Sequence, residues 1–376
     1  MKARMPPQVL VSSNYAWTIV NFRLPLIRKL KSEGYEVHVL TQFDGYEEKL
    51  REEVDSITHL FVSRKGINPF VDFLTILDYV KHFFVLKPDI LLLFTIKPVI
   101  YGSIAARIFR IPKIVMITGL GTAFLKDNWL KSLVQGLYRI ALRKPCKVFF
   151  QNLDDKGLFI SRKIVCDVST ELVPGSGIDL ESFSEAPYPD NQEPKFLLIA
   201  RMLRDKGVGE YVEAARILKK KYPKMRFQLL GPLGVENRSA ILKNDMDNWV
   251  EEEVIEYLGE TDNVRTFIEQ SDCIVLPSYR EGTSRVLLEA AAMARPIIAS
   301  NVTGCREVVD DQQTGFLCEA KNSSDLAEKI ELMSRLSKSA RRQMGLRGRK
   351  KVAAEFDQKI VAGIYLEALR EVTAEA

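Results

Sequence analysis

Two cations follow a predicted strand in the second half of the chain. An apolar run over residues 195–200 predicts the strand, and Arg201 and Lys206 come directly after it, five residues apart. The guanidinium of Arg201 is permanently charged and binds two oxygens at once, whereas the ammonium of Lys206 is a point charge. Such a pair favours a ligand that carries a diphosphate. Ordinary surface charges in a solvated loop are the competing interpretation.

A second group of polar residues follows the strand predicted over residues 273–276. The loop after it carries Glu281 and Gly282, and a helix is predicted to begin near Thr283. Free backbone N–H groups at the start of a helix bind phosphate. Glu289 lies about one and a half turns into that helix, where its carboxylate is placed to accept hydrogen bonds from ribose hydroxyls. A capped surface helix with an incidental glutamate is the alternative.

One turn supplies a further candidate contact for a ligand. Gly231 and Pro232 end the strand predicted over residues 226–230. Glycine lets a backbone approach a ligand closely. The signal is weak by itself, because ordinary turns use glycine and proline often.

The first strand-to-helix loop lacks the glycines of two common nucleotide sites. Ser12, Ser13 and Asn14 stand where a dinucleotide-binding fold would place its Gly-x-Gly-x-x-Gly motif. A backbone that contacts a pyrophosphate there needs glycine, so a nicotinamide or flavin dehydrogenase is disfavoured. The chain also has no Gly-x-x-x-x-Gly-Lys-Ser/Thr motif, which disfavours a P-loop kinase or ATPase.

We expect no metal and no cofactor. The cysteines and histidines are scattered without the spacing of a zinc site; they are Cys146, Cys166, Cys273, Cys305 and Cys318, and His38, His59 and His82. Asp245 and Asp247 match an Asp-x-Asp motif, but they lie in a charged helical stretch and not at a strand end. The odd cysteine count and the absence of an apolar leader at the start predict a cytoplasmic protein.

These residues need two α/β domains to position them. A chain of 376 residues exceeds what one core usually organises, and its composition, 46% hydrophobic and 27% charged, is that of a globular protein. Short apolar runs alternate with helical spacing throughout, which predicts parallel sheets. The proline-rich segment 185–194 is the predicted linker. We therefore expect domains over residues 1–186 and 187–357, with a helix over 358–376 packing back on the first.

The charge is divided unevenly between the two halves. Residues 1–170 hold 25 Lys and Arg against 15 Asp and Glu, whereas residues 171–376 hold 29 against 34. The basic half favours an anionic partner, either a nucleic acid or a membrane. The chain has no recognised DNA- or RNA-binding motif, so we expect no nucleic acid. It also has no apolar run near the ~20 residues that span a bilayer.

A basic segment with aromatic residues, 126–147, is the predicted membrane contact. Its apolar members are Trp129, Leu130, Leu133, Leu137, Tyr138 and Ile140, and its cations include Lys126, Lys131, Arg139, Arg143 and Lys144. This pattern is typical of a helix that lies on anionic lipid headgroups. An ordinary packed helix with solvated cations is the alternative.

The second half resembles a known family. Glu281 and Glu289 stand in the Glu-x7-Glu arrangement of retaining, nucleotide-sugar-dependent glycosyltransferases of the GT-B type, and EGTSRVLLEAAAMARPIIASNVTGCREVVDDQQTGFL is similar to that family almost continuously. Arg201, Lys206 and Gly207 match its diphosphate-binding loop. The stretches NYAWTIVNFRLPLI and FTIKPVIYGSIAARIFRIPKIVMITGLGTAF resemble the bacterial subgroup of glycosyltransferase family four that adds N-acetylhexosamines or related sugars to polyprenyl-diphosphate-linked oligosaccharides.

The resemblance implies a role for each matching residue. Arg201, Lys206 and Glu281 are the implied catalytic residues. The implied donor contacts are Gly231, Pro232, Leu258, Gly282, Thr283, Ser284 and Glu289, and the implied acceptor and sugar contacts are Ser12, Ser13, Asn14, Thr118 and Gly119. The chain departs from many relatives in two places. It has no glycine in its first loop, and it has Thr118 where many carry a histidine.

The resemblance also implies the fold and the reaction. The expected fold is GT-B, in which two Rossmann-like, doubly wound parallel-sheet domains face each other across a cleft. The expected enzyme is retaining and metal-independent. It would move a sugar from a UDP-sugar to a polyprenyl-diphosphate-linked saccharide, in O-antigen, capsule or glycoprotein assembly, from the inner face of the cytoplasmic membrane. The alternatives are a UDP-sugar 2-epimerase of the same architecture and a basic membrane- or nucleic-acid-binding protein without catalysis.

Overall fold

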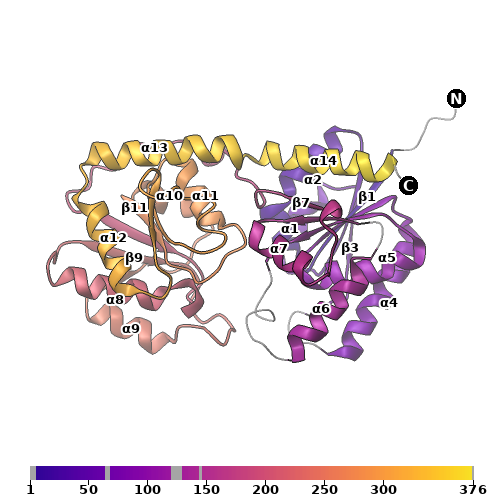
Figure 1. The fold of residues 1–376 in the computed structure, drawn as a ribbon, viewed down its shortest axis with the longest axis horizontal. Helices are drawn as coiled ribbons and strands as arrows, with labels where there is room; N and C mark the ends of the chain where they lie inside the picture. The colour runs from indigo at the N-terminus through magenta and orange to yellow at the C-terminus, as the bar shows by residue number, and fades with distance from the viewer. Residues whose placement is uncertain (1–5, 64–67, 120–128, 144–145, 375–376) are drawn as a thin grey trace. The chain divides into compact units, whose positions relative to one another are not determined.

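The chain folds into two compact units, which a computed structural model describes for residues 6–63, 68–119, 129–143 and 146–374 (Figure 1). The first unit is built from residues 1–176 together with 358–376, and the second from residues 177–357. Each unit is an α/β domain around a parallel sheet. The two sheets confirm the α/β class and the strand alternation predicted from the sequence.

The sheet of the first unit has seven parallel strands in the order β3-β2-β1-β4-β5-β6-β7. The strands are β1 (Gln8–Ser13), β2 (Glu36–Thr41), β3 (Ser56–His59), β4 (Ile90–Phe94), β5 (Lys113–Ile117), β6 (Cys146–Phe150) and β7 (Thr170–Leu172). The order of strands reverses between β1 and β4, so the loops that follow these two strands lead to opposite faces. Ligands of doubly wound sheets bind at such a reversal, beyond the carboxyl ends of the strands.

Helices cover both faces of this sheet. One face packs on α1 (Ala16–Phe22), α2 (Leu24–Ser32) and α14 (Gln358–Ala374), and the other on α4 (Pro69–Leu86), the π-helical turn Pro98–Gly102, α5 (Ser103–Phe109), α6 (Trp129–Ala141) and α7 (Leu153–Ser161). The short α3 (Glu48–Arg51) precedes β3. The C-terminal helix belongs to this unit because Val361, Tyr365 and Leu369 are buried in its core.

The second sheet has six parallel strands in the order β10-β9-β8-β11-β12-β13. They are β8 (Lys195–Ile199), β9 (Arg226–Leu230), β10 (Glu256–Tyr257), β11 (Cys273–Leu276), β12 (Ile297–Ser300) and β13 (Gly315–Cys318). The order reverses between β8 and β11. The two strongest motifs of the sequence therefore follow the two strands that meet at the reversal.

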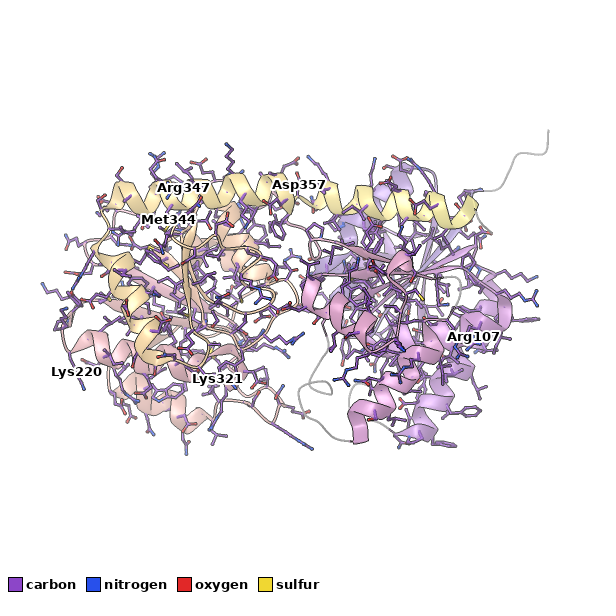
Figure 2. All side chains as sticks on the ribbon, in the orientation of Figure 1. Arg107, Lys220, Lys321, Met344, Arg347 and Asp357 are labelled. Carbon is purple, nitrogen blue, oxygen red and sulfur yellow. The ribbon has the colours of Figure 1, made fainter. Side chains whose placement is uncertain are left out.

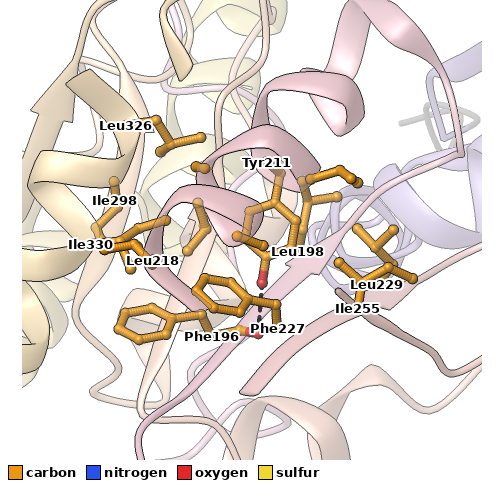
Figure 3. Packing of buried hydrophobic residues seen from close by; sticks show 14 of the residues in the cluster. Phe196, Leu198, Tyr211, Leu218, Phe227, Leu229, Ile255, Ile298, Leu326 and Ile330 are labelled. Carbon is orange, nitrogen blue, oxygen red and sulfur yellow. Dashed lines mark hydrogen bonds between the residues drawn. The ribbon is translucent and has the colours of Figure 1, made fainter. Parts of the chain in front are cut away.

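The helices of the second unit also form two layers. Those on one face are α8 (Val208–Lys219), α9 (Lys243–Glu251) and α12 (Ser323–Arg335), those on the other are α10 (Val264–Glu269) and α11 (Arg285–Ala292), and α13 (Lys338–Glu355) contributes to both cores. Figure 3 shows the first core, in which the Phe196 and Phe227 rings stack with centroids 5.8 Å apart. The buried Tyr211 hydroxyl donates to the Phe196 carbonyl at 2.7 Å, which satisfies its only polar group.

The division between the units lies after residue 176, ten residues before the predicted boundary. Ile178 is buried in the core of the second unit that lies under α10 and α11, and its N–H donates to the Phe356 carbonyl at 2.8 Å. The proline-rich segment 185–194 is not a free linker either. The buried Arg295 guanidinium donates to the carbonyls of Ala186 and Pro187, which ties the segment to the second unit.

Candidate active site

The loops after β8 and β11 are joined to each other at the reversal of the second sheet. The Tyr279 N–H donates to the Asp205 carbonyl at 2.9 Å, and the Ser278 hydroxyl donates to the same carbonyl at 3.2 Å. Asp205 lies in the 3₁₀ turn Arg204–Lys206, which connects β8 to α8. Two segments that are far apart in the sequence thus form one surface at the carboxyl edge of the sheet.

Gly207 allows this close approach. Its φ is 74°, in the left-handed region, and a Cβ at this position would lie 2.1 Å from the carbonyl oxygen of Pro277. Real Cβ atoms do not come so close to another backbone, so only glycine fits between the two loops. The conformation also ends the 3₁₀ turn and starts α8 directly afterwards.

Lys206 and Glu281 meet across the two loops. The Lys206 ammonium donates to Glu281 Oε1 at 2.5 Å, and both side chains are largely buried. The Arg201 side chain is exposed, and no residue in the described part of the chain pairs with its guanidinium. The edge therefore presents one cation that is held in place by a carboxylate and one that is free for an anion.

The start of α11 lies beside this ion pair. The backbone of its loop is held by the loop after β12, because the Glu281 N–H donates to the Thr303 carbonyl and the Ser284 N–H to the Gly304 carbonyl, each at 3.0 Å. Ser284 makes no side-chain cap at this helix. The first turn therefore keeps backbone N–H groups that can bind the oxygens of a phosphate. Gly282 and Thr283, in the same loop, are partly exposed.

Glu289 lies one helical turn beyond Arg285 on α11. Only 8% of its surface is exposed, and the Arg285 Nε donates to its Oε1 at 2.9 Å. Burial raises the pKa of the Glu289 carboxyl above its ordinary value, and Arg285 opposes the shift. A buried carboxylate with one charged partner is ready to accept further donors, such as sugar hydroxyls.

The Gly231 turn packs against the loop after β8. Gly231 has a φ of 139°, and a Cβ there would lie 1.9 Å from the Ala200 carbonyl oxygen. The Tyr257 hydroxyl donates to the Gly231 carbonyl at 2.9 Å, and the Met202 N–H donates to the Pro232 carbonyl at 3.0 Å. Leu258 lies next to Tyr257 and is partly buried against the second core. The structure thus brings the predicted donor residues to neighbouring strand ends of one sheet.

The first unit gives mixed results for the predicted acceptor residues. Ser12 and Ser13 are fully buried; the Ser12 hydroxyl bonds to the Leu40 carbonyl and the Tyr79 hydroxyl, and Ser13 bonds to Thr18. Their hydroxyls therefore hold the loop together, and the role of these two residues on the acceptor side stays a prediction.

Three other predicted residues of the first unit are partly exposed at strand ends. Asn14 follows β1, and Thr118 and Gly119 follow β5. The Asn14 N–H donates to the Thr95 hydroxyl at 3.0 Å, while the Asn14 Oδ1 atom is buried and has no hydrogen-bond partner in the described structure. An acceptor atom of this kind fits a donor group on a ligand.

Sequence reasoning assigned no role to Thr95 and Lys97, which follow β4 at the reversal of the first sheet. Thr95 has a φ of 65°, which is rare for a β-branched residue and marks backbone strain. The Lys97 ammonium lies 3.0 Å from the buried carboxylate of Asp72. The charged residue and the proline directly after the apolar run at residues 90–94 were the available signal.

The predicted membrane segment divides between core and surface. Val134 and Tyr138 of α6 are buried in a core of the first unit, whereas Leu133 and Ile140 are exposed. Lys126 and Lys144 lie outside the described residues, as do the side chains of Trp129, Leu130 and Lys131. No described helix combines the length and the apolar character needed to cross a bilayer.

Two family models together match most of the chain. The model described as glycosyl transferases group 1 matches residues 181–351, within the second unit, and the model described as glycosyl transferase 4-like matches residues 8–152, within the first. The chain therefore belongs to the glycosyltransferases of the GT-B class, with the fold that the sequence predicted.

Two individual relatives match nearly the whole chain. The chain is 28% identical over 366 residues to N,N'-diacetylbacillosaminyl-diphospho-undecaprenol alpha-1,3-N-acetylgalactosaminyltransferase of Campylobacter jejuni, covering 93% of this chain and 95% of the relative. It is 26% identical over 358 residues to the capsular polysaccharide biosynthesis glycosyltransferase CapM of Staphylococcus aureus, covering 91% and 92%. These matches support a glycosyltransferase of glycan biosynthesis.

Solved structures agree on the fold. A glycosyltransferase from Rickettsia africae superposes with a TM-score of 0.79 at 20% identity, covering 99% of this chain and all of that one. Anabaena HepE in complex with UDP superposes with a TM-score of 0.77 at 17% identity, covering 98% of this chain and all of that one. Both chains share the two-domain GT-B architecture.

Proposed function

We propose that the chain is a retaining, metal-independent glycosyltransferase. It transfers a sugar, an N-acetylhexosamine, from a UDP-sugar to a polyprenyl-diphosphate-linked saccharide. The observation that carries the proposal is the joined surface at the reversal of the second sheet, where Arg201, Lys206 and the start of α11 lie together. The printed activity of the Campylobacter jejuni relative supports the sugar and the lipid-linked acceptor, and the UDP complex of HepE supports the nucleotide.

The site has the charges that this reaction needs. When the glycosidic bond breaks, the bonding electrons stay with the diphosphate, and its negative charge grows. Arg201 and Lys206 stabilise that charge, and the N–H groups of α11 add to their effect. Glu281 orients the Lys206 ammonium, and Glu289 accepts hydrogen bonds from the ribose. No cofactor takes part, since the UDP-sugar is a substrate.

Retention follows if the acceptor attacks from the face that the diphosphate leaves. A bond then forms between the acceptor oxygen and the anomeric carbon as the bond to the diphosphate oxygen breaks, and the acceptor proton passes to the departing diphosphate. The diphosphate serves as the base, so the site needs no histidine. The residues of the first unit that contact the acceptor and the sugar in this proposal are Ser12, Ser13, Asn14, Thr118 and Gly119.

A ligand panel tests the donor. We expect UDP-sugars, but not GDP- or ADP-sugars, to raise the melting temperature, because a ligand that binds only the folded state stabilises it by about 2.7 kcal/mol at one hundred times its dissociation constant. Incubation with a short-chain lipid diphosphate saccharide should then yield an α-linked product. Epimerised sugar without any acceptor would support a 2-epimerase instead.

A matched pair of variants tests the site. Lys206→Ala should lower kcat/KM by about 10²- to 10³-fold, the cost of one oxyanion-stabilising group. Arg204→Ala, two residues away on the same turn with an exposed side chain, should change it less than about threefold because Arg204 lacks a role in the site. Equal activity of the two variants would show that the diphosphate binds elsewhere.

A further inference from the structure

The helix α4 exposes a continuous apolar stripe. Phe70 and Phe84 are 70% and 67% exposed, and Phe73 and Leu77 lie between them with about half of their surface in water. The spacing of these residues follows one side of a helix, while Tyr79 and Phe83 on the other side are buried in the core. The stripe extends over about 21 Å, at 1.5 Å per residue.

The apolar surface continues beyond α4. Phe61, after β3, is exposed; its N–H donates to Asp78 on α4, and its side chain lines a shallow hollow together with Leu77 and Lys81. Ile108 on α5 is exposed as well. Soluble monomers rarely expose contiguous apolar patches of this kind unless the patch binds something.

Cations are exposed on and beside the helices of this face. They are Lys81 on α4, Arg107 on α5, Arg110 directly after α5, Arg139 near the end of α6 and Arg143 just after it. α4, α5 and α6 cover the same face of the first sheet (Figure 1). Arg107, labelled in Figure 2, also donates to the Ile140 carbonyl and so links α5 to α6.

The acidic residues of these three helices are occupied. α5 and α6 contain none, and α4 contains two. Asp72 is buried and paired with Lys97. Asp78 accepts the Phe61 N–H and lies 3.4 Å from His82 Nε2. The described face therefore combines exposed apolar side chains with positive charge.

We propose that this face, formed by α4 with the flanking cations of α5 and α6, docks on an anionic lipid bilayer. Helices with aromatic residues on one side and cations beside them lie in the interface, with the apolar side chains among the headgroups and acyl chains. The stripe is placed for such shallow insertion, because α4 carries Asp72, Asp78 and Lys81 and does not qualify as a membrane span.

The charge favours lipid over a second copy of the chain. Two copies that met through this face would bring the same cations together without acidic partners, and like charges across an interface oppose association. Anionic headgroups supply the missing negative charge. The inference deepens the proposed function and rests on it in one respect: bilayer docking brings the first unit to the surface where a polyprenyl-linked acceptor resides.

Sedimentation of the full chain with lipid vesicles tests the proposal. Wild type should bind vesicles of phosphatidylglycerol and phosphatidylcholine, and bind phosphatidylcholine alone much more weakly. The double variant Phe73→Ser with Phe84→Ser should lower the partition coefficient at least about tenfold, because two apolar side chains no longer leave water. Lys81→Glu with Arg110→Glu should lower it about 25-fold or more, since each cation contributes about fivefold near an anionic surface.

Matched variants on the second unit show whether a loss of vesicle binding is specific to the proposed face or follows from any change of surface polarity or net charge. Leu242 is an exposed apolar residue there, so Leu242→Ser controls for the loss of exposed apolar surface in the variant Phe73→Ser with Phe84→Ser. The exposed Lys220 and Arg342 allow Lys220→Glu with Arg342→Glu to control for the charge reversal. Both controls should bind vesicles within about twofold of wild type, and unchanged far-ultraviolet circular dichroism will show that every variant folds.

Three results would overturn the proposal. The stripe variants could bind anionic vesicles as tightly as wild type, or wild type could fail to bind them. The third is a wild-type dimer in light scattering that the variant Phe73→Ser with Phe84→Ser converts to a monomer, which would make the face an interface between copies.

An assay without membranes separates this inference from the proposed function. Transfer from a UDP-sugar to a short, water-soluble diphosphate acceptor should proceed within about twofold of wild type in the stripe variants, which lie outside the site. Normal transfer without vesicle binding would refute only the docking surface. Vesicle binding by wild type without any transfer would refute only the proposed function.

Discussion

Gly207→Ala tests the packing on which the candidate donor site depends. The substitution adds one methyl group at a position with a φ of 74°, where the new Cβ would lie 2.1 Å from the Pro277 carbonyl oxygen and 2.7 Å from Pro277 Cγ. Because the neighbour is mostly backbone at the end of a buried strand, a rotamer change cannot relieve the clash. The loops after β8 and β11 must separate by about 1 Å.

The cost has two parts. Placing a residue with a Cβ in the left-handed region costs about 1 kcal/mol. Separating the loops weakens the hydrogen bonds that Tyr279 and Ser278 donate to the Asp205 carbonyl, which contribute roughly 1 kcal/mol each. The expected loss in the free energy of unfolding is therefore about 3 kcal/mol. A 1 Å displacement of Lys206 should also lower kcat/KM by more than about tenfold.

Fluorescence-monitored urea denaturation measures this loss in the second unit alone. Trp249, on α9, is the tryptophan of that unit and packs against its core. Replacing Trp17 and Trp129 with phenylalanine leaves Trp249 as the only tryptophan, since the chain has three. With a slope near 2 kcal/mol per molar urea, the midpoint should fall by about 1.5 M.

Gly209→Ala is the matched control. Gly209 lies two residues further along, in α8, and a Cβ there would have no atom within 4 Å. The same chemical change should therefore stabilise the protein by about 0.5–1 kcal/mol through helix propensity. The two variants should shift the midpoint in opposite directions. Equal midpoints, or a Gly207→Ala variant with unchanged midpoint and kcat/KM, would refute the close approach of the two loops.

Three further outcomes are expected. Burial raises the pKa of the Glu289 carboxyl above 4.5. The free energy of unfolding therefore falls as the pH rises through that raised pKa, and it recovers as the pH falls towards 4.5. Glu289→Gln should therefore be at least as stable as wild type at pH 8 and less stable than wild type at lower pH, and it should bind UDP-sugar more weakly at both. Equal denaturation midpoints at every pH would contradict the burial. Arg295→Met should lower the free energy of unfolding by about 3 kcal/mol and expose segment 185–194 to glutamyl endopeptidase, whereas a resistant segment would show that other contacts hold it. Tyr257→Phe removes the hydrogen bond to Gly231 and should raise the KM for the donor about threefold; a KM equal to that of wild type would separate this turn from the nucleotide.

The central strands could be predicted because burial on both faces leaves a clear pattern. Residues 90–94, 114–117 and 273–276 read as continuous apolar runs, and the strands β4, β5 and β11 contain them. Strands at the sheet edges were missed, including β3 and β7, because they are short and only partly buried. The 18-residue helix α4 was missed for the opposite reason: apolar residues on both of its sides hide the helical period.

Helical spacing over residues 22–33 predicts one helix, and the structure has α2 over most of this range. The preceding helix α1 ends at Phe22, and Arg23 separates the two. Pro25 lies in the first turn of α2, where its missing N–H costs nothing. The proline therefore agrees with a helix that begins at Leu24.

For the candidate site, the sequence predicted the types of residue and their positions after strands, but not which of them lie together. The spacing placed Arg201, Lys206 and Glu281 after strands, but whether those strands are neighbours depends on the strand order, which is a property of the whole sheet. The burial of Ser12 and Ser13 could not be anticipated either. The Ser12 hydroxyl bonds to Leu40 on a neighbouring strand, and the Ser13 hydroxyl bonds to Thr18 on the following helix. Both hydroxyls are therefore already hydrogen-bonded within the first unit.

The two units use positive charge in different ways. Residues 171–376 carry more acidic than basic residues, yet their site presents cations, because Arg201 and Lys206 are concentrated at one strand end. A few charges at short range outweigh a diffuse net charge of opposite sign, since interactions between distant surface charges are screened within about 10 Å. The excess cations of residues 1–170 include those spread over the exposed face of α4, α5 and α6. Net charge therefore indicates the partner of a broad surface, whereas the ligand of a site follows from the few groups that the strand ends bring together.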